Sequence, residues 1–407
     1  MATTTEGFHQ ALASHVADLE DQGTAKGAES VIVGVVRGDG TRGPRYHLAG
    51  EGERLFLKMN SNNYLGMSLR PELIAAEEEA TRDFGVGPGA VRFISGTYRQ
   101  HVALEQELAA FHGRESAMIY SSAYAAILGV LVPLITAETT IISDALNHNC
   151  IINAIRLARP KEKKIYRHLD LEQLEDALAT AEGRRALIVT DGIFSMRGSS
   201  APLAEIVALA RRYDHRFPEN AVVVVDDSHG VGAFGATGRG TEEHAGAHAD
   251  VLVATLGKAF GTNGGYVTGD ERLTRYLRES APTYIYSNPI TVGECAASSA
   301  SLALLQSDTG QALLEHLRAM TKRFQRGLLD LGHETIPGDH PVVPLMVRDT
   351  PRTTALVAHL HARGVLATGL NYPVVPQGDQ SIRFQVSADH TATDIDEALG
   401  VIERFEG

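Results

Sequence analysis

The sequence is short of cysteine, of basic runs and of long apolar runs, and each shortage excludes a class of protein. It holds two cysteines, Cys150 and Cys295, with no metal-ligand spacing around them. We therefore expect two reduced thiols in a cytosolic protein and no disulfide framework. The net charge is −13 and no long basic run occurs, which argues against a nucleic-acid partner.

Membrane and secretory features are also missing from the sequence. The longest apolar runs are too short and too interrupted to span a bilayer. Residues 1–6 lack the basic and apolar regions of a signal peptide. We expect a cytoplasmic protein without a membrane partner.

What is present is typical of a globular enzyme with more than one domain. The chain has 407 residues, 43% of them apolar and 21% charged, and this length favours two domains. Phe8, Leu12, Val16 and Leu19 recur at helical spacing, and Gly23 ends the pattern. We expect a helix and loops, or a small hairpin, over residues 1–54, a large domain over 55–295 and a smaller domain over 296–407.

Strand-like runs alternate with helical patterns from about Leu55 onward, which predicts an α/β fold with parallel strands joined by helical crossovers. In the large domain the runs that predict strands are 116–120, 139–143, 186–190, 221–225 and 250–254. The smaller domain has strand-like runs at 342–347, 365–367 and 382–386. A final helix follows, for which Thr393 and Asp396 resemble a capping box.

Two short segments follow predicted strands and carry groups that suit pyridoxal 5'-phosphate (PLP). Lys258 stands in Thr255-Leu-Gly-Lys258, after the run 250–254, and Asp226 and His229 follow the run 221–225. Ligands bind at the carboxyl ends of strands in open α/β sheets. A lysine that can form an imine, facing a carboxylate that keeps a ring nitrogen protonated, is the minimal set for PLP.

Each of these residues also has a plainer interpretation. A lone lysine is usually a solvated surface group, and Asp226 would serve as a helix cap. The spacing of Asp226 and His229 also fits a metal pair. Small residues around Lys258 leave room for a flat cofactor, and no third or fourth metal ligand follows. We therefore expect PLP and no metal.

Three further positions stay open on the residues alone. His148 is either a structural loop histidine or a ring stacked on the cofactor. Arg383, on a predicted strand, makes a surface salt bridge or clamps a carboxylate. Ala123 and Tyr124 open a helix after the run 116–120, and a helix N-terminus would hold a phosphate.

Taken in order along the chain, these segments resemble the α-oxoamine synthase family of fold-type-I PLP enzymes. The matching blocks are Asn62-Asn-Tyr-Leu-Gly66, Arg92-Phe-Ile-Ser-Gly-Thr97, Ser143-Asp-Ala145 with Asn147-His148, Asp191-Gly-Ile-Phe-Ser-Met196, Asp226-Asp-Ser-His229, Gly238-Arg-Gly240, Thr255-Leu-Gly-Lys258 and Ser287-Asn288. The resemblance implies a large domain with a mostly parallel sheet and a smaller C-terminal α/β domain. It also implies a homodimer with shared active sites.

The resemblance also implies a role for each site residue. Lys258 forms the imine with PLP and later moves the Cα proton. Asp226 pairs with the ring nitrogen, and His148 stacks on the ring. The remaining roles are contact with the ring hydroxyl oxygen (His229, Ser195), the phosphate site (backbone of Ala123 and Tyr124, Thr255, and Ser287 of the partner subunit) and the amino-acid carboxylate site (Asn62, Arg383).

The implied reaction joins a small α-amino acid to an acyl thioester and yields an α-amino ketone or its β-keto acid precursor. The tail from Gly369 to His390 looks most like the glycine C-acetyltransferases, so glycine and acetyl-CoA are the first expectation. The segments around Tyr124 and His101 look more like the 5-aminolevulinate synthases.

Departures from the family pattern leave the acyl donor open. Ile127 stands where the family usually has asparagine, and Arg197 where it has an acidic residue. Residues 23–45 do not match the basic segment that relatives use for CoA. The alternatives are a specialised synthase with another donor, a PLP aminotransferase or aldolase, and a non-enzymatic PLP-binding regulator. The last usually carries a DNA-binding domain, for which this chain has neither spare length nor a basic patch.

Overall fold

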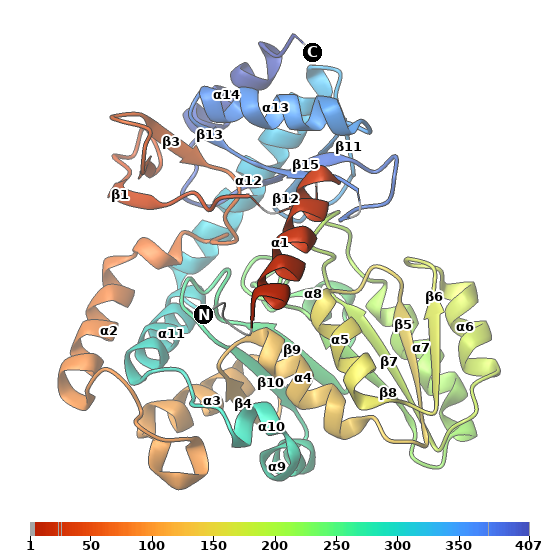
Figure 1. Ribbon diagram of the computed structural model, residues 1–407. Coiled ribbons are helices and arrows are strands. Elements are labelled where there is room, and N and C mark those ends of the chain that lie inside the picture. Colours follow the sequence, from red (N-terminus) through yellow and green to blue (C-terminus); the bar gives the residue numbers. More distant parts are fainter. Residues whose placement is uncertain (1–4, 23, 26, 373, 407) are drawn as a thin grey trace.

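The structure is a computed structural model that describes residues 5–22, 24–25, 27–372 and 374–406 (Figure 1). The predicted helix end at Gly23 and Pro373 of the tail lie outside these residues. The largest sheet has seven strands in the order β4-β10-β9-β8-β7-β5-β6. These strands are β4 (Ser116–Tyr120), β5 (Thr139–Asp144), β6 (Glu162–Tyr166), β7 (Arg185–Asp191), β8 (Ala221–Asp226), β9 (Val251–Thr255) and β10 (Gly265–Gly269).

The predicted parallel pairing is confirmed for the centre of this sheet. β6, β5, β7, β8 and β9 run parallel. β10 pairs antiparallel with both β4 and β9, because the chain turns back through the glycine-containing segment 257–265. The sheet is therefore mostly parallel. The parallel strands β5, β7, β8 and β9 place Asp144, Asp191, Asp226 and Thr255 at their carboxyl ends.

Helices cover both faces of this sheet and make two apolar cores. Successive residues of β8 point into opposite cores, since Val224 belongs to one and Val223 and Val225 to the other. The core of Val224 is closed by α4 (Ala123–Leu134), α5 (Asn149–Ala158), α9 (Glu271–Ser280) and α10 (Pro282–Ile285). The other is closed by α2 (Pro71–Phe84), α3 (Arg99–Phe111), α6 (Leu171–Ala179), α7 (Leu203–Tyr213) and α11 (Val292–Leu305). The short α8 (Thr241–Ala245) follows β8.

The C-terminal part packs α12 (Asp308–Asp330), α13 (Thr350–Ala362) and α14 (Ala392–Glu403) on an antiparallel sheet in the order β11-β12-β15-β14. Its strands are β11 (Glu334–Thr335), β12 (Val342–Met346), β14 (Thr368–Leu370) and β15 (Ser381–Gln385). The predicted cap of the last helix was wrong by two residues. Thr391 accepts from the Asp394 N–H, and Asp394 accepts from the Thr391 N–H.

The predicted N-terminal helix and hairpin are confirmed, as α1 (Glu6–Asp21) and the antiparallel pair β1 (Ile32–Val36) and β2 (Arg45–Leu48). β2 pairs with β3 (Leu55–Lys58), which runs parallel to β13 (Val365–Leu366). None of the α1 residues is buried. The predicted domain boundaries at residues 54 and 295 stay predictions.

None of the helices in the described ranges combines the length and the apolar character that crossing a bilayer requires. Both cysteines are buried free thiols.

Candidate active site

A cavity opens at the carboxyl ends of β5, β7, β8 and β9, where seven of the predicted site residues meet. The empty space between its walls is about 360 Å³. Seven of its lining residues belong to the predicted site: Ala123, Tyr124, His148, Ser195, Asp226, His229 and Lys258. Four more were not predicted as site residues: Cys150, Asp191, Ile193 and Ser228.

Lys258 follows β9 and reaches into this cavity without a partner of its own. Within the described ranges no hydrogen bond or ion pair involves its Nζ atom. Burial lowers the pKa of the amine to about 8, although the negative charges of Asp226 and Asp191 act in the opposite direction. About a tenth of this lysine is therefore uncharged at pH 7, and the uncharged amine is the state that can act as a nucleophile or a base.

Asp226 is the last residue of β8. One of its carboxylate oxygens accepts two hydrogen bonds, and the other has only a weak donor nearby. Its Oδ1 accepts the Ser228 N–H at 3.1 Å and the Ser228 hydroxyl at 2.5 Å. Its Oδ2 lies 3.7 Å from Cys150 Sγ, a weak donor. Asp191 is paired with Asp226 in the sheet register. Burial, and then the charge of Asp226, raise the pKa of Asp191 well above its usual value.

His148 caps α5 and is fixed from two sides. Its main-chain N–H donates to Asp191 Oδ2 at 3.2 Å. Its Nδ1 accepts the Cys150 N–H at 3.3 Å, so a ring proton belongs on Nε2. Burial lowers the pKa of the imidazole. The neighbouring Asn147 is anchored on the main chain of Val189 at 2.8 Å, so the loop that carries the ring is rigid.

Ala123 and Tyr124 begin α4 at the cavity edge. Ser122 caps this helix and accepts the Ala125 N–H at 3.0 Å. A Cβ atom on Gly265 would come within 2.2 Å of the Ala123 nitrogen, so only glycine lets β10 pass this close to the start of the helix. Thr255 lies beside the cavity, and its hydroxyl donates to the Gly264 carbonyl at 3.0 Å.

The two residues predicted to hold the amino-acid carboxylate come from the loop after β3 and from β15. Arg383 donates through Nη1 to the Ser195 carbonyl at 3.3 Å. Its Nε atom is buried without a hydrogen-bond partner among the described residues. Asn62 Oδ1 accepts from the Gln385 amide and lies 3.3 Å from the Tyr64 hydroxyl. The Asn62 amide nitrogen is therefore the group left for a ligand.

Ser287 does not line the cavity of its own chain. It follows Tyr286, which is 79% exposed. Among the residues that the structure describes, no group of three His, Cys, Asp or Glu side chains could hold a metal ion.

Some site residues were missed by reasoning from the sequence. Asp191 begins the segment 191–196, and its position after the run 186–190 was a usable signal, because that run is the strand next to the one that ends at Asp226. Cys150 had no such signal, since its contacts with His148 and Asp226 depend on how α5 packs against β8.

The chain is similar to known proteins over most of its length. The family described as aminotransferase class I and II matches residues 55–402. The chain is 39% identical to 8-amino-7-oxononanoate synthase of Thermosipho melanesiensis over 86% of its length and 87% of that protein. It is 40% identical to the mitochondrial 2-amino-3-ketobutyrate coenzyme A ligase of Homo sapiens, over 86% of its length and 83% of that protein. The structure of Sphingomonas wittichii serine palmitoyltransferase superimposes with a TM-score of 0.87 at 29% identity, covering 99% of this chain and 98% of the other.

Proposed function

The chain belongs to the α-oxoamine synthases of the class I and II aminotransferase family, and on that premise we propose that it joins glycine to the acetyl group of acetyl-CoA. It is a PLP-dependent acyltransferase that condenses an amino acid with an acyl-CoA. The proposal concerns the two substrates and the residues that act on them.

The observation that carries the proposal is two polar groups without partners, one in the cavity and one on Arg383, which donates to the carbonyl of the cavity residue Ser195. Lys258 Nζ has no partner in the described part of the chain, and Arg383 Nε is buried and unpaired there. Burying Arg383 Nε unpaired costs free energy, so a ligand with a complementary group would stabilise the site. An aldehyde and a pyridine nitrogen fit Lys258 and Asp226, and a carboxylate fits Arg383.

Bound PLP acts as an electron sink for negative charge that develops at the Cα atom of the amino acid. Asp226 would hold the pyridine nitrogen protonated, and His148 would cover the ring. Lys258, once freed by the incoming amino group, would take the Cα proton, for which a pKa near 8 is suitable.

The remaining predicted residues would orient the two molecules. Ser195 and His229 would meet the ring hydroxyl oxygen. The N–H groups at Ala123 and Tyr124, with Thr255, would hold the phosphate. Arg383 would bind the carboxylate through a charge-assisted hydrogen bond, together with the Asn62 amide.

Glycine and acetyl-CoA are proposed on resemblance to relatives. The tail from Gly369 to His390 resembles the glycine C-acetyltransferases, and the chain is 39% identical to the 2-amino-3-ketobutyrate coenzyme A ligase of Bos taurus.

Release of free thiol tests this proposal. Glycine, alanine and serine would each be combined with acetyl-, succinyl- and long-chain acyl-CoA and with acyl carrier protein thioesters. We expect thiol release to be fastest with glycine and acetyl-CoA, and absent without an amino acid. A faster reaction with another pair would reassign the substrates. Transfer of the amino group to a keto acid without thiol release would show that the enzyme is an aminotransferase.

We also propose a homodimer in which Ser287 completes the partner's phosphate site. Large apolar side chains are exposed beside it and in the segment 86–94, as expected of a surface that another chain covers. They are Val86, Phe93, Ile94 and Tyr286.

Hybrid dimers test the shared site. An inactive Lys258→Ala chain would be mixed with an inactive chain that carries Ser287→Ala and Asn288→Ala. About a quarter of wild-type activity should return, because random mixing makes half of the dimers hybrid and each hybrid has one intact site. A fully active monomer in sedimentation would contradict the proposal.

A further inference from the structure

Tyr64 lies at the centre of a buried chain of hydrogen bonds that joins two parts of the site. Its side chain is 0% exposed. Its hydroxyl lies 2.8 Å from His229 Nδ1 and 3.3 Å from Asn62 Oδ1. The same Asn62 oxygen accepts from Gln385 Nε2. The chain therefore runs from the predicted carboxylate site, through Tyr64, to the histidine predicted to meet the cofactor ring.

Counting protons limits these bonds to two arrangements. Burial raises the pKa of the Tyr64 phenol, so the hydroxyl keeps its single proton and can donate only one hydrogen bond. Burial, with the charge of Lys258 next in weight, lowers the pKa of His229 well below its usual value, so this ring is neutral and carries one proton. Asn62 Oδ1 already has a donor in Gln385. We assign the Tyr64 proton to the shorter contact, to His229 Nδ1, when the site is empty. In the reverse arrangement His229 Nδ1–H donates to Tyr64 and the Tyr64 hydroxyl donates to Asn62 Oδ1.

This assignment places the proton of His229 on Nε2, which has no hydrogen-bond partner in the described ranges. The main chain of His229 is also fixed. His340 accepts the Val342 N–H on Nδ1 at 3.1 Å, so its Nε2–H donates to the His229 carbonyl at 2.9 Å. His229 thus offers the cavity a donor whose strength depends on the bond from Tyr64.

We propose that Tyr64 is a positioning residue that links occupation of the amino-acid carboxylate site to the hydrogen bond that His229 offers the cofactor. The inference rests on the proposed roles of Asn62, Arg383 and His229. A carboxylate bound to the Asn62 amide nitrogen polarises the amide and makes Oδ1 a stronger acceptor. The Tyr64 proton then shifts toward Asn62, His229 Nδ1 loses its donor, and His229 Nε2–H becomes a weaker donor.

The test uses the holoenzyme and propionate, which has a carboxylate and no amino group to react with the cofactor. In the wild type, propionate should compete with glycine and change the visible absorption of the bound PLP. In Tyr64→Phe, propionate should compete with an unchanged inhibition constant, and the absorption change should be lost. A role confined to packing would leave the absorption change in place, since phenylalanine keeps the ring.

The matched control is Tyr266→Phe. Tyr266 is equally buried at 0% exposure, and its hydroxyl also lies 2.8 Å from a histidine nitrogen, Nε2 of His112. Neither residue lines the cavity, so the response to propionate should match the wild type.

Gln385→Leu gives a second route to the same conclusion if Tyr64→Phe folds poorly. Loss of the Gln385 donor frees Asn62 Oδ1 for the Tyr64 proton, so the spectrum without propionate should shift toward the propionate-bound one. Two results would overturn the coupling alone, provided that propionate competes with glycine. One is a full absorption change in Tyr64→Phe, and the other is no absorption change in the wild type. Failure of propionate to compete in the wild type would overturn the carboxylate site itself, and the coupling with it.

Discussion

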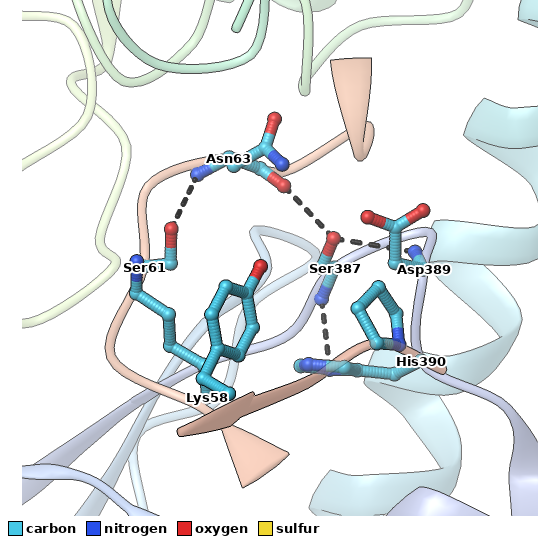
Figure 2. Close-up of a pocket in the computed structure, with 8 residues that line it drawn as sticks. Lys58, Ser61, Asn63, Ser387, Asp389 and His390 are labelled. Carbon is cyan, nitrogen blue, oxygen red and sulfur yellow. Dashed lines mark hydrogen bonds between the residues drawn. The ribbon is translucent and has the colours of Figure 1, made fainter. Parts of the chain in front are cut away.

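Two lysines of this chain each line a hollow, and only one of them is expected to be catalytic. Lys258 lines the cavity of about 360 Å³ at the ends of the large sheet. Lys58 lines a hollow of about 290 Å³ at the end of β3, together with Ser61, Asn63, Asp389 and other residues (Figure 2). Burial lowers the pKa of both amines. Neither the size of the space nor desolvation of a lysine therefore identifies the active site.

The two hollows differ in where they lie and in which groups they bring together. Around Lys58, four lining residues have hydrogen-bond partners, namely Ser61, Asn63, Ser387 and His390. Ser387 donates to the Asn63 carbonyl at 2.8 Å, and its N–H donates to His390 Nδ1 at 3.1 Å (Figure 2). The Lys58 ammonium lies over the Tyr46 ring, 5.0 Å from its centre, which supplies a cation–π contact.

The cavity of Lys258 lies at the carboxyl ends of the parallel strands, where ligands bind in open α/β sheets, and it brings Lys258 together with Asp226 and Asp191. The hollow of Lys58 lies at the end of β3, outside the seven-stranded sheet. The comparison therefore predicts strong effects for changes around Lys258 and small effects for the same changes around Lys58.

The largest expected effect is that of Lys258→Ala. This change removes both the nucleophile and the base, and general base catalysis alone contributes about 10²–10⁴-fold, so no turnover should be measurable. Lys58→Ala should remain active. Borohydride reduction followed by peptide mapping of the wild type should find the pyridoxyl group on Lys258. A label on Lys58 or on any other lysine would remove the distinction between the two hollows.

Asp226→Asn should come next in effect. A neutral amide cannot hold the pyridine nitrogen protonated, so exchange of the glycine Cα hydrogen with solvent deuterium should slow by about 10²–10³-fold, as for loss of one preorganised electrostatic contact. The matched change is Asp389→Asn, which neutralises a carboxyl group in the hollow of Lys58 and should leave exchange unaltered. Equal rates in wild type and Asp226→Asn would take Asp226 out of this role.

Arg383→Ala should weaken glycine binding by about 2–5 kcal/mol, because the bound carboxylate would lose a charge-assisted partner. Arg197→Ala is the control. Arg197 already has an ion-pair partner, Asp379, at 2.7 Å, and its loss should scarcely alter the affinity. Spectral titration with glycine, alanine and serine measures both variants. Wild-type affinities in Arg383→Ala for all three would exclude the clamp.

Much of the fold could be predicted because buried strands are continuous apolar runs, as in 221–225. β6 was missed because it is an edge strand with Lys163 and Lys164 and only Tyr166 fully buried. β10 was missed because it is short and has a glycine at each end. Both strands were missed because their apolar pattern is weak, and neither has an unusual conformation.

The helix cap shows a different limit of the sequence. The chain offers the same spacing twice, at Thr391 with Asp394 and at Thr393 with Asp396. Asp394 also accepts from Arg45 Nη2 at 2.7 Å and from the Gly43 N–H at 2.8 Å. These contacts come from nearly 350 residues away, and they support the first pair over the second.

The same limit applies to the candidate site. Asp226, His229 and Lys258 were predictable because each lies at the end of a strand or three residues beyond it, and strand ends converge at one edge of the sheet. The contact of Tyr64 with His229 joins a loop after β3 to the segment after β8, and no local sequence pattern predicts it. The chemical roles of the site residues stay predictions that the experiments above address.

The smallest expected effect is on the pH at which the apoenzyme recombines with PLP. Only the uncharged amine of Lys258 attacks the aldehyde, and burial lowers its pKa to about 8. The recombination rate should therefore rise about tenfold per pH unit below pH 8 and level off above it. A lysine with the ordinary value of about 10.4 would still be gaining rate well beyond pH 9. Stopped-flow absorption would measure the profile.

The two hollows also separate the causes of this midpoint. The negative charge of Asp226 favours the ammonium form of Lys258 and so raises its pKa against the effect of burial. Asp226→Asn should therefore move the midpoint below that of the wild type, whereas Asp389→Asn and Lys58→Ala should leave it in place. A midpoint that rises in Asp226→Asn would mean that Asp226 does not act on Lys258 through its charge. A midpoint that moves in Asp389→Asn would mean that the two hollows are electrostatically connected, and the comparison between them would no longer hold.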